Sequence, residues 1–308
     1  MNALKKILRG NLTAKHLLVV AVFVLILVLT RCAEAGAETT AEGFVYSVRA
    51  DGSAVWAGYT GPQGRVTVPS QLDGHPLTAV EGNPLYREDK VMIMRCTLTV
   101  APDHPYLAVL DGVLFGKTDR RLISWTPAWK AEDYAVPDGV RIIGPHAFIN
   151  ADIRTLTVPD SVTEMGPFAF AYCDRLRSVT IPGSLHTIPL FAFADDDALR
   201  DIRLGLGVTV IDEGAFESCR GLEQISLPRS LTTIGYSAFG GIPRLRRVVI
   251  HRSVTTIAND SFTLYDGETL TTYPNPSVVL VTPSDSYAAR YAVGYGLKTE
   301  EPLDWLRD

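Results

Sequence analysis

The sequence has only six histidines and four cysteines, and they are scattered along the chain. Its histidines include no pair at i, i+4 and none beside a cysteine at ligand spacing, so we expect no metal site. No G-x-S-x-G motif, phosphate-binding loop or dinucleotide fingerprint is present, and no pair of carboxylates stands out. We therefore expect neither enzyme activity nor a cofactor.

Cysteine is scarce, with four residues in 308. Cys173 and Cys219 occupy the same place in two units of a repeated pattern described below, with one unit between them. Stacking of the units would separate them by roughly 10 Å, beyond the ~7 Å Cα limit for a disulfide. We expect two buried, inert thiols. A bridge from Cys96 would need a fold that the pattern does not predict.

One run of acidic residues, Asp195 to Asp197, could attract a cation. It occupies the place of the bend that contains cysteine in other units. We expect a solvated turn there.

Long apolar runs are also lacking, apart from the thirteen residues Leu17–Leu29, which fall short of the roughly 20 that span a bilayer. Four basic residues precede this run and the small-residue stretch 33–37 follows it. This order predicts a secretory signal over residues 1–37, with an uncleaved signal anchor as the alternative. Arg31, directly before Cys32, argues against lipidation. We expect a protein that is secreted or held at the cell surface.

Negative charge dominates the remainder of the chain. Loss of residues 1–37 removes five basic and one acidic residue from totals of 29 and 34, leaving 24 and 33 and a net charge of −9. Such a charge disfavours nucleic acid or an anionic membrane as the main partner. We expect contact with a membrane only through an uncleaved signal, and we expect a monomer.

The feature that the sequence does have is an internal repeat. Six phenylalanines, five of them after alanine, lie 22 or 23 residues apart: Phe148, Phe170, Phe193, Phe216, Phe239 and Phe262. Five and eight residues before each one lie Ile or Met and Val or Leu, and four of the six have proline eleven residues before. A fixed period of this length predicts stacked units that bury a shared core.

Each unit supplies a short strand and an inward-facing aromatic ring. In Leu176–Pro182, Val179 and Ile181 alternate with Ser178 and Thr180, as a half-buried strand requires. Residues 184–188 are expected to form a second short extended segment. The phenylalanine is expected to fill the interior. The glycines that follow the Ile column are only a preference, because Pro189 in that column excludes a positive φ.

These columns resemble the BspA-type leucine-rich repeat of bacterial surface and secreted proteins, with its pattern IPxSVTxIGxxAFxxCxxL. The resemblance extends to residues 102–127 as a hairpin insertion and to residues 44–82 as capping units. Residues 284–297 resemble the family's terminal helix, with Ala288, Tyr291 and Ala292 on the face that covers the array. Residues 83–97 match least, and we expect a distorted turn or an exposed loop there.

The fold class predicted is mainly β. It is a leucine-rich-repeat solenoid of about 23-residue turns with short parallel strands, N-terminal hairpin and capping units and a short C-terminal capping helix. The domains predicted are a signal at 1–37, an N-terminal cap with divergent repeats and the hairpin at 38–131, the repeats at 132–283, and the C-terminal cap and tail at 284–308.

Exposed strand positions are the candidate site, because core columns are fixed by packing. Basic and hydroxyl side chains recur there about 5 Å apart and form what we call the arginine strip. Its members are Arg154, Arg177, Arg200, Arg203, Arg246, Arg247, Thr157, Thr180 and Gln224. The strip predicts a docking surface for an acidic protein or glycan. The alternative is a solvated ladder whose arginines pair with Asp152, Asp174, Asp197 or Asp201.

What the resemblance implies is a non-enzymatic repeat scaffold for recognition, such as adhesion. Two other hypotheses remain. One is a structural envelope component without a specific ligand. The other is a secreted hydrolase that uses residues 83–130, the segment irregular enough to build a cleft.

Overall fold

The computed structural model describes residues 37–87, 92–126, 132–266, 269 and 271–302. The predicted signal segment, apart from Ala37, lies outside these residues. None of the helices in the described ranges is long and apolar enough to cross a membrane. The chain divides into two units, residues 1–129 with Tyr265–Thr271, and Lys130–Leu264 with the residues from Thr272 onward.

The first unit contains a five-stranded sheet in the order β1-β2-β3-β6-β5. Its strands are β1 (Glu38–Thr39), β2 (Phe44–Val48), β3 (Ala54–Tyr59), β5 (Gln71–Leu72) and β6 (His75–Val80). β2 and β3 are antiparallel, and β6 runs parallel to β3. Tyr46, Trp56 and Leu77 are fully buried and form its core.

The rest of the first unit combines one parallel strand pair with antiparallel strands. β4 (Gly64–Val68) pairs in parallel with β9 (Cys96–Val100), and β7 (Tyr86–Arg87) is antiparallel to β8 (Met92–Ile93). Leu85, Ile93 and Met94 are buried, so the described part of residues 83–97 is not a simple exposed loop. The predicted hairpin is a meander of three strands: β10 (Leu107–Leu110), β11 (Val113–Gly116) and β12 (Arg121–Trp125).

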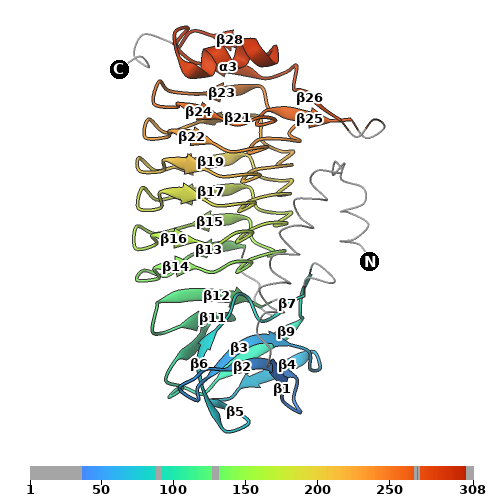
Figure 1. Cartoon of the computed structure of the whole chain (residues 1–308), viewed down its shortest axis with the longest axis vertical. Helices are drawn as coiled ribbons and strands as arrows, with labels where there is room; N and C mark the ends of the chain where they lie inside the picture. The colour runs from blue at the N-terminus through green and yellow to red at the C-terminus, as the bar shows by residue number, and fades with distance from the viewer. Residues whose placement is uncertain (1–36, 88–91, 127–131, 267–268, 270, 303–308) are drawn as a thin grey trace. The chain divides into compact units, whose positions relative to one another are not determined.

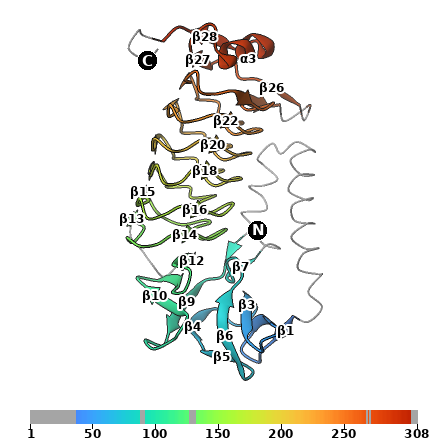
Figure 2. The same cartoon turned by 60° about the vertical axis from the view of Figure 1, so that its left-hand side comes forward.

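The second unit is a stack of turns, visible in Figures 1 and 2 as the green-to-red part of the chain. Its main strands are parallel and lie in two sheets, and they bury alternate residues such as Val179 and Ile181, as predicted. The first sheet contains β13 (Asp133–Ala135), β15 (Thr155–Thr157), β17 (Ser178–Ile181) and β19 (Asp201–Leu204). The second contains β21 (Gln224–Ser226), β23 (Arg247–Val249), β27 (Val279–Val281) and β28 (Lys298–Glu300).

A second set of two-residue strands follows at the next side of each turn. These are β14 (Ile142–Ile143), β16 (Glu164–Met165), β18 (Thr187–Ile188), β20 (Val210–Ile211), β22 (Thr233–Ile234) and β24 (Thr256–Ile257). β14 and β16 pair in parallel, as do β18, β20, β22 and β24 in that order. The second extended segment predicted at 184–188 is therefore shorter than expected. β25 (Thr263–Tyr265) and β26 (Thr272–Pro274) form a separate two-stranded sheet.

The repeated Ala-Phe pairs form the third side and fill the interior. Each of the six phenylalanines is at most 1% exposed, and neighbouring rings stack with centroids 5.3–5.6 Å apart. The backbone continues the ladder, since the Phe170 amide donates to the Ala192 carbonyl at 2.9 Å. The prediction that these rings plug the core is confirmed.

Sharp bends flank each Ala-Phe pair, and the sequence pattern did not predict them. Residues two before and two after the phenylalanine have positive φ in turn after turn, as in Phe191 (51°) and Asp195 (59°) around Phe193. The glycines that follow the Ile column do not share this conformation. Asn, Asp, Ser and Gly recur in the later position, which agrees with their tolerance of left-handed backbone.

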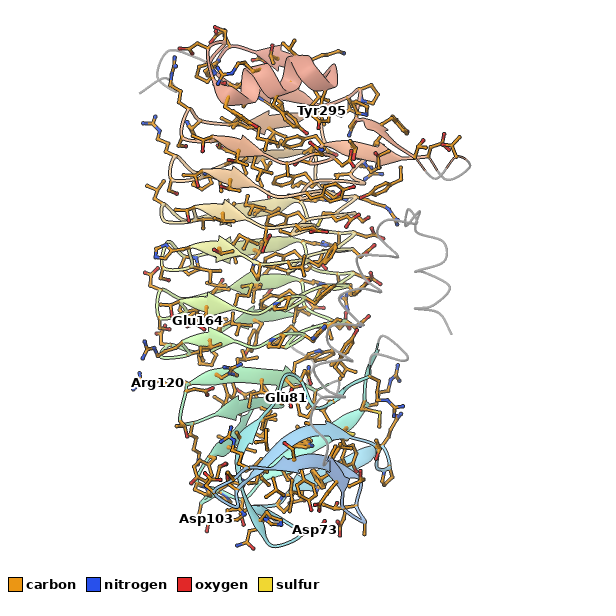
Figure 3. The ribbon with its side chains drawn as sticks, in the orientation of Figure 1. Asp73, Glu81, Asp103, Arg120, Glu164 and Tyr295 are labelled. Carbon is orange, nitrogen blue, oxygen red and sulfur yellow. The ribbon has the colours of Figure 1, made fainter. Side chains whose placement is uncertain are left out.

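The predicted terminal helix is α3 (Tyr287–Tyr295). Ser286 caps it by accepting a hydrogen bond from the Ala289 amide at 3.0 Å, and Gly296 ends it with φ 66°. Ala288, Tyr291 and Ala292 are buried, as predicted, and the Tyr291 ring lies edge-on to Phe262 at 6.2 Å. Tyr295, labelled in Figure 3, donates its hydroxyl to Asn259. The helix therefore covers the last ring of the stack.

Candidate functional site

The strands bring the arginine strip together on one side of the second unit. The Arg177 amide donates to the Arg154 carbonyl at 2.7 Å, and the Arg200 amide donates to the Arg177 carbonyl at 2.9 Å. In the second sheet, the Arg246 amide donates to the carbonyl of Glu223, which lies one turn before it, at 2.8 Å. We call the residue directly before each main strand its leading residue. Leading residues joined in this way are one strand spacing apart, about 4.8 Å.

The other members of the strip face outward from the strands themselves. Thr157, Thr180 and Arg203 lie side by side in register, and Gln224 pairs with Arg247. Thr157, Arg203 and Gln224 are exposed. The parallel pairing is interrupted between β19 and β21, so the strip crosses from one sheet to the next.

Two arginines of the strip are engaged within the protein. Arg154 Nη1 lies 2.5 Å from Glu132 Oε2, and Arg247 binds both carboxylate oxygens of Glu300 at 2.6 and 3.0 Å. These are exposed surface pairs, which contribute little to stability. They leave Arg154 and Arg247 less available to a partner than the other arginines.

The other four arginines, Arg177, Arg200, Arg203 and Arg246, are exposed and make no ion pair with any described residue. Two of the acids expected to neutralise the strip pair elsewhere. Asp152 binds Arg175 at 2.9 Å, and Asp197 binds Arg220 at 3.4 Å. Inter-turn ion pairs do exist on this surface, but they use arginines outside these four positions.

The prediction of a solvated turn at Asp195–Asp197 is wrong for its middle residue. Asp196 is completely buried. Its Oδ1 accepts a hydrogen bond from the Cys173 amide at 2.7 Å, and its Oδ2 has no hydrogen-bond partner among the described residues. Burial, together with the neighbouring carboxylates, raises the pKa of Asp196 well above its ordinary value, despite that hydrogen bond.

Asp196 is buried because it shares an interior column. The residue three positions after each phenylalanine is Cys173 or Cys219 in the adjacent turns, and both are fully buried. Alignment of Asp196 with these cysteines was the signal that could have identified it.

The cysteines behave as predicted. Cys96, Cys173 and Cys219 are free and buried. The Cys173 and Cys219 thiols donate to the Phe148 and Phe193 carbonyls at 3.2 and 3.1 Å. Burial raises the pKa of both thiols, so they remain protonated and unreactive.

No group of three or more histidine, cysteine, aspartate or glutamate side chains in the described ranges is arranged to hold a metal ion. In the first unit, His104 instead has a structural role. Its Nδ1 accepts from the Tyr106 and Leu107 amides at 3.2 and 3.1 Å, and its Nε2 lies 3.2 Å from the Pro69 carbonyl. Nδ1 must therefore be unprotonated, and burial lowers the pKa of the ring.

His104→Ala is expected to destabilise the first unit by about 1–3 kcal/mol at pH 7.5, because two amides lose their acceptor. A lowered folded-state pKa means that the neutral ring contributes stability above about pH 6.5 that is lost as the pH falls. Urea unfolding of both proteins from pH 7.5 to 5 should show the difference between them shrinking. A constant difference would mean that the ring does not titrate as its contacts require.

These features define the second unit as a solenoid of short parallel strands around a stack of phenylalanine rings. Residues 137–266 match the family model described as the BspA type leucine rich repeat region, in six copies. The array of this chain therefore belongs to the BspA-type leucine-rich repeats.

Two solved structures share the fold. One is the pneumococcal vaccine antigen PcpA, with 17% identity and a TM-score of 0.60 over 80% of this chain and 57% of that one. The other is a leucine-rich repeat protein from Bacteroides ovatus ATCC 8483, with 19% identity and a TM-score of 0.50 over 78% of this chain and 54% of that one. The chain thus matches a little over half the length of each. No curated protein matches it.

Proposed function

We propose that the chain is a non-enzymatic recognition scaffold that binds an acidic protein or glycan through the arginine strip. The observation that supports it is the row of four exposed arginines that form no ion pair with any described residue, on a chain of net negative charge; Glu223 interrupts the row between Arg200 and Arg246. Such a row attracts acidic groups, and the guanidinium fork suits carboxylates and sulfates. A stacked array holds the row in fixed spacing, which reduces the ordering cost of binding.

The proposed location is the cell surface or the external medium. The basic and apolar order of residues 5–29 supports export. The fold shared with a pneumococcal vaccine antigen is compatible with this location. An extracellular array would meet ligands of neighbouring or host cells, which makes adhesion the function that we favour.

The triple variant Arg177→Glu, Arg200→Glu, Arg246→Glu is expected to lose partner binding while keeping its fold, since all three side chains are exposed. The wild-type protein should bind immobilised heparin or polyglutamate with an affinity that falls as salt rises. Biolayer interferometry with these probes and a glycan array measure the effect, and circular dichroism measures folding.

A matched control applies the same charge change to the first unit, as Arg49→Glu, Arg65→Glu, Arg120→Glu. Figure 3 shows Arg120 projecting from the turn between β11 and β12. The control should retain binding. Equal loss in both variants would assign binding to net charge alone. Binding unchanged by the strip variant would remove the strip from the function.

The alternatives have their own outcomes. An envelope component would bind none of the probes saturably, in which case the proposal of recognition fails. A hydrolase would turn over a glycan or peptide substrate, and that activity would survive the triple variant.

A further inference from the structure

In each turn, a corner joins the main strand, such as β17, to the two-residue strand that follows it, such as β18. One residue of each turn lies at the surface of this corner. We call this set the corner column. It consists of Asp138, Asp160, Gly183, Leu206, Arg229 and Arg252. All but Gly183 are exposed, and Gly183 is half-buried. In chain order the column is therefore acidic for two turns, uncharged for two and basic for two.

The two central turns are built differently from the others. Leu206 is 80% exposed, which is unusual for a leucine in a repeat that otherwise buries its apolar residues. It lies between Gly205 and Gly207, at positions where four of the other five turns have proline and four have serine. A Cβ on Gly207 would lie 1.9 Å from the Gly183 carbonyl oxygen, and one on Gly205 would lie 2.3 Å from the Gly183 nitrogen. Three glycines thus bring two turns close together and leave the Leu206 side chain on the outside.

We infer that the corner column is an interface between two copies of this chain, related by a two-fold axis that makes the two arrays antiparallel. An axis between the third and fourth turns places Asp160 of each copy opposite Arg229 of the other. It places Asp138 opposite Arg252 at the two outer ends. This is the self-complementary arrangement that an isologous contact requires.

The centre of this contact explains Leu206. Each Leu206 lies opposite the Gly183 of the other copy, where no side chain competes for the space. The two leucines then lie side by side across the axis and bury each other. A parallel arrangement would place like charges opposite each other at both ends of the column, so charge selects the antiparallel one.

The neighbouring columns do not oppose the pairing. Ser161, Ser184 and Ser230 lie on one side of the corner, and Thr157, Thr180 and Ser226 lie on the other. Arg203 is the charged residue of the strand column next to the corner, and in the antiparallel register it faces Thr180 of the second copy. No like-charged pair arises in these columns.

The interface is small, and a weak association follows. Six turns extend over about 25 Å and only a few side chains in width, which is less than the roughly 800 Å² per partner of a standard interface. Arg252 also binds Asp285 of its own chain at 2.6 Å, so the outer pair competes with an ion pair inside each copy. We expect a dissociation constant on the order of 10–100 µM that rises with salt.

This inference does not require the proposed function, but it shares Arg203, Thr157 and Thr180 with the arginine strip. The other exposed arginines of the strip, Arg177, Arg200 and Arg246, lie before the main strands, and the corner column lies after them. A dimer leaves these three arginines accessible and duplicates them, whereas Arg203 lies at the contact. It also replaces the monomer expected from the sequence.

Sedimentation equilibrium of the purified protein, from about 5 to 500 µM at low salt, tests the dimer. Asp160→Arg and Arg229→Asp should each weaken dimerisation at least ~10-fold, because each change opposes two like charges twice in the dimer. The double variant with both changes restores opposite charges and should dimerise as the wild type does. Leu206→Asp should abolish the dimer.

Two exposed residues of the first unit supply the matched control. Asp103→Arg with Arg120→Asp makes the same exchange at positions labelled in Figure 3 and should leave dimerisation unchanged. Circular dichroism confirms that each variant folds. A wild type that stays monomeric over this range overturns the inference. So does a dimer that tolerates Asp160→Arg, or a double variant that fails to recover.

Discussion

Replacement of Phe193 by alanine is expected to destabilise the array by about 3–5 kcal/mol. Phe193 is fully buried, and its ring lies between those of Phe170 and Phe216 at 5.5 and 5.4 Å with interplanar angles of 6°. Truncation leaves a cavity in the middle of the stack and removes ring contacts on both faces. Because each turn is stable only through its neighbours, both halves of the array lose support.

Urea unfolding followed by circular dichroism measures this effect as a lower midpoint. Val293→Ala is the control, since that side chain is 79% exposed and its truncation should change stability by no more than about 0.5 kcal/mol. A loss below about 1 kcal/mol for Phe193→Ala would contradict the central role of the stack.

The sequence predicted the array well because its signals repeat. The phenylalanine column and the two aliphatic columns before it each recur six times, so the strands and the buried rings could be assigned from spacing, whereas the covering face of α3 followed from the family resemblance. The same comparison could have identified the left-handed positions, because Asn150, Asp195 and Gly241 occupy one column. A residue that recurs at a fixed period must fit the same packing in every turn, so few other conformations are open to it.

Features that occur only once in the structure could not be predicted from the sequence. Which arginines of the strip find a carboxylate depends on the conformations of long side chains, and spacing does not fix these. Arg154 pairs with Glu132, the residue at the same place in the preceding turn, whereas Arg246 forms no ion pair with Glu223 in the same relation, and Arg247 pairs with Glu300 more than fifty residues away. The first unit has no strict repeat, so the three-stranded meander at β10–β12 and the short β7 and β8 could not be derived.

Replacement of Asp196 by cysteine is expected to stabilise the array at pH 7 by about 1–3 kcal/mol. The change removes a buried carboxyl whose Oδ2 has no partner among the described residues. It inserts the side chain that the adjacent turns already hold at this place, Cys173 and Cys219, whose thiols donate to backbone carbonyls. A change that usually destabilises a core should therefore stabilise this one.

The gain is expected to depend on pH in a defined direction. Burial raises the pKa of Asp196 in the folded state, so the stability that its neutral form allows is fully present below the unfolded-state pKa of about 3.9. This stability is lost as the pH rises through the folded-state pKa. The difference between Asp196→Cys and wild type should consequently be small near pH 4 and grow toward pH 8.

Both proteins are measured with a reductant present, because the new thiol lies one turn, about 4.8 Å, from Cys173 and Cys219 and could otherwise form a disulfide. Comparison of the two proteins at each pH cancels the contributions of the other carboxylates, which they share. Asp195→Asn is the matched control. Asp195 is one of the carboxylates that raise the pKa of Asp196, so this variant should reduce the pH dependence without inserting the thiol, and its φ of 59° suits asparagine. If Asp196→Cys destabilises the array at pH 7, the carboxylate is a net stabiliser and the hydrogen bond from the Cys173 amide outweighs its burial.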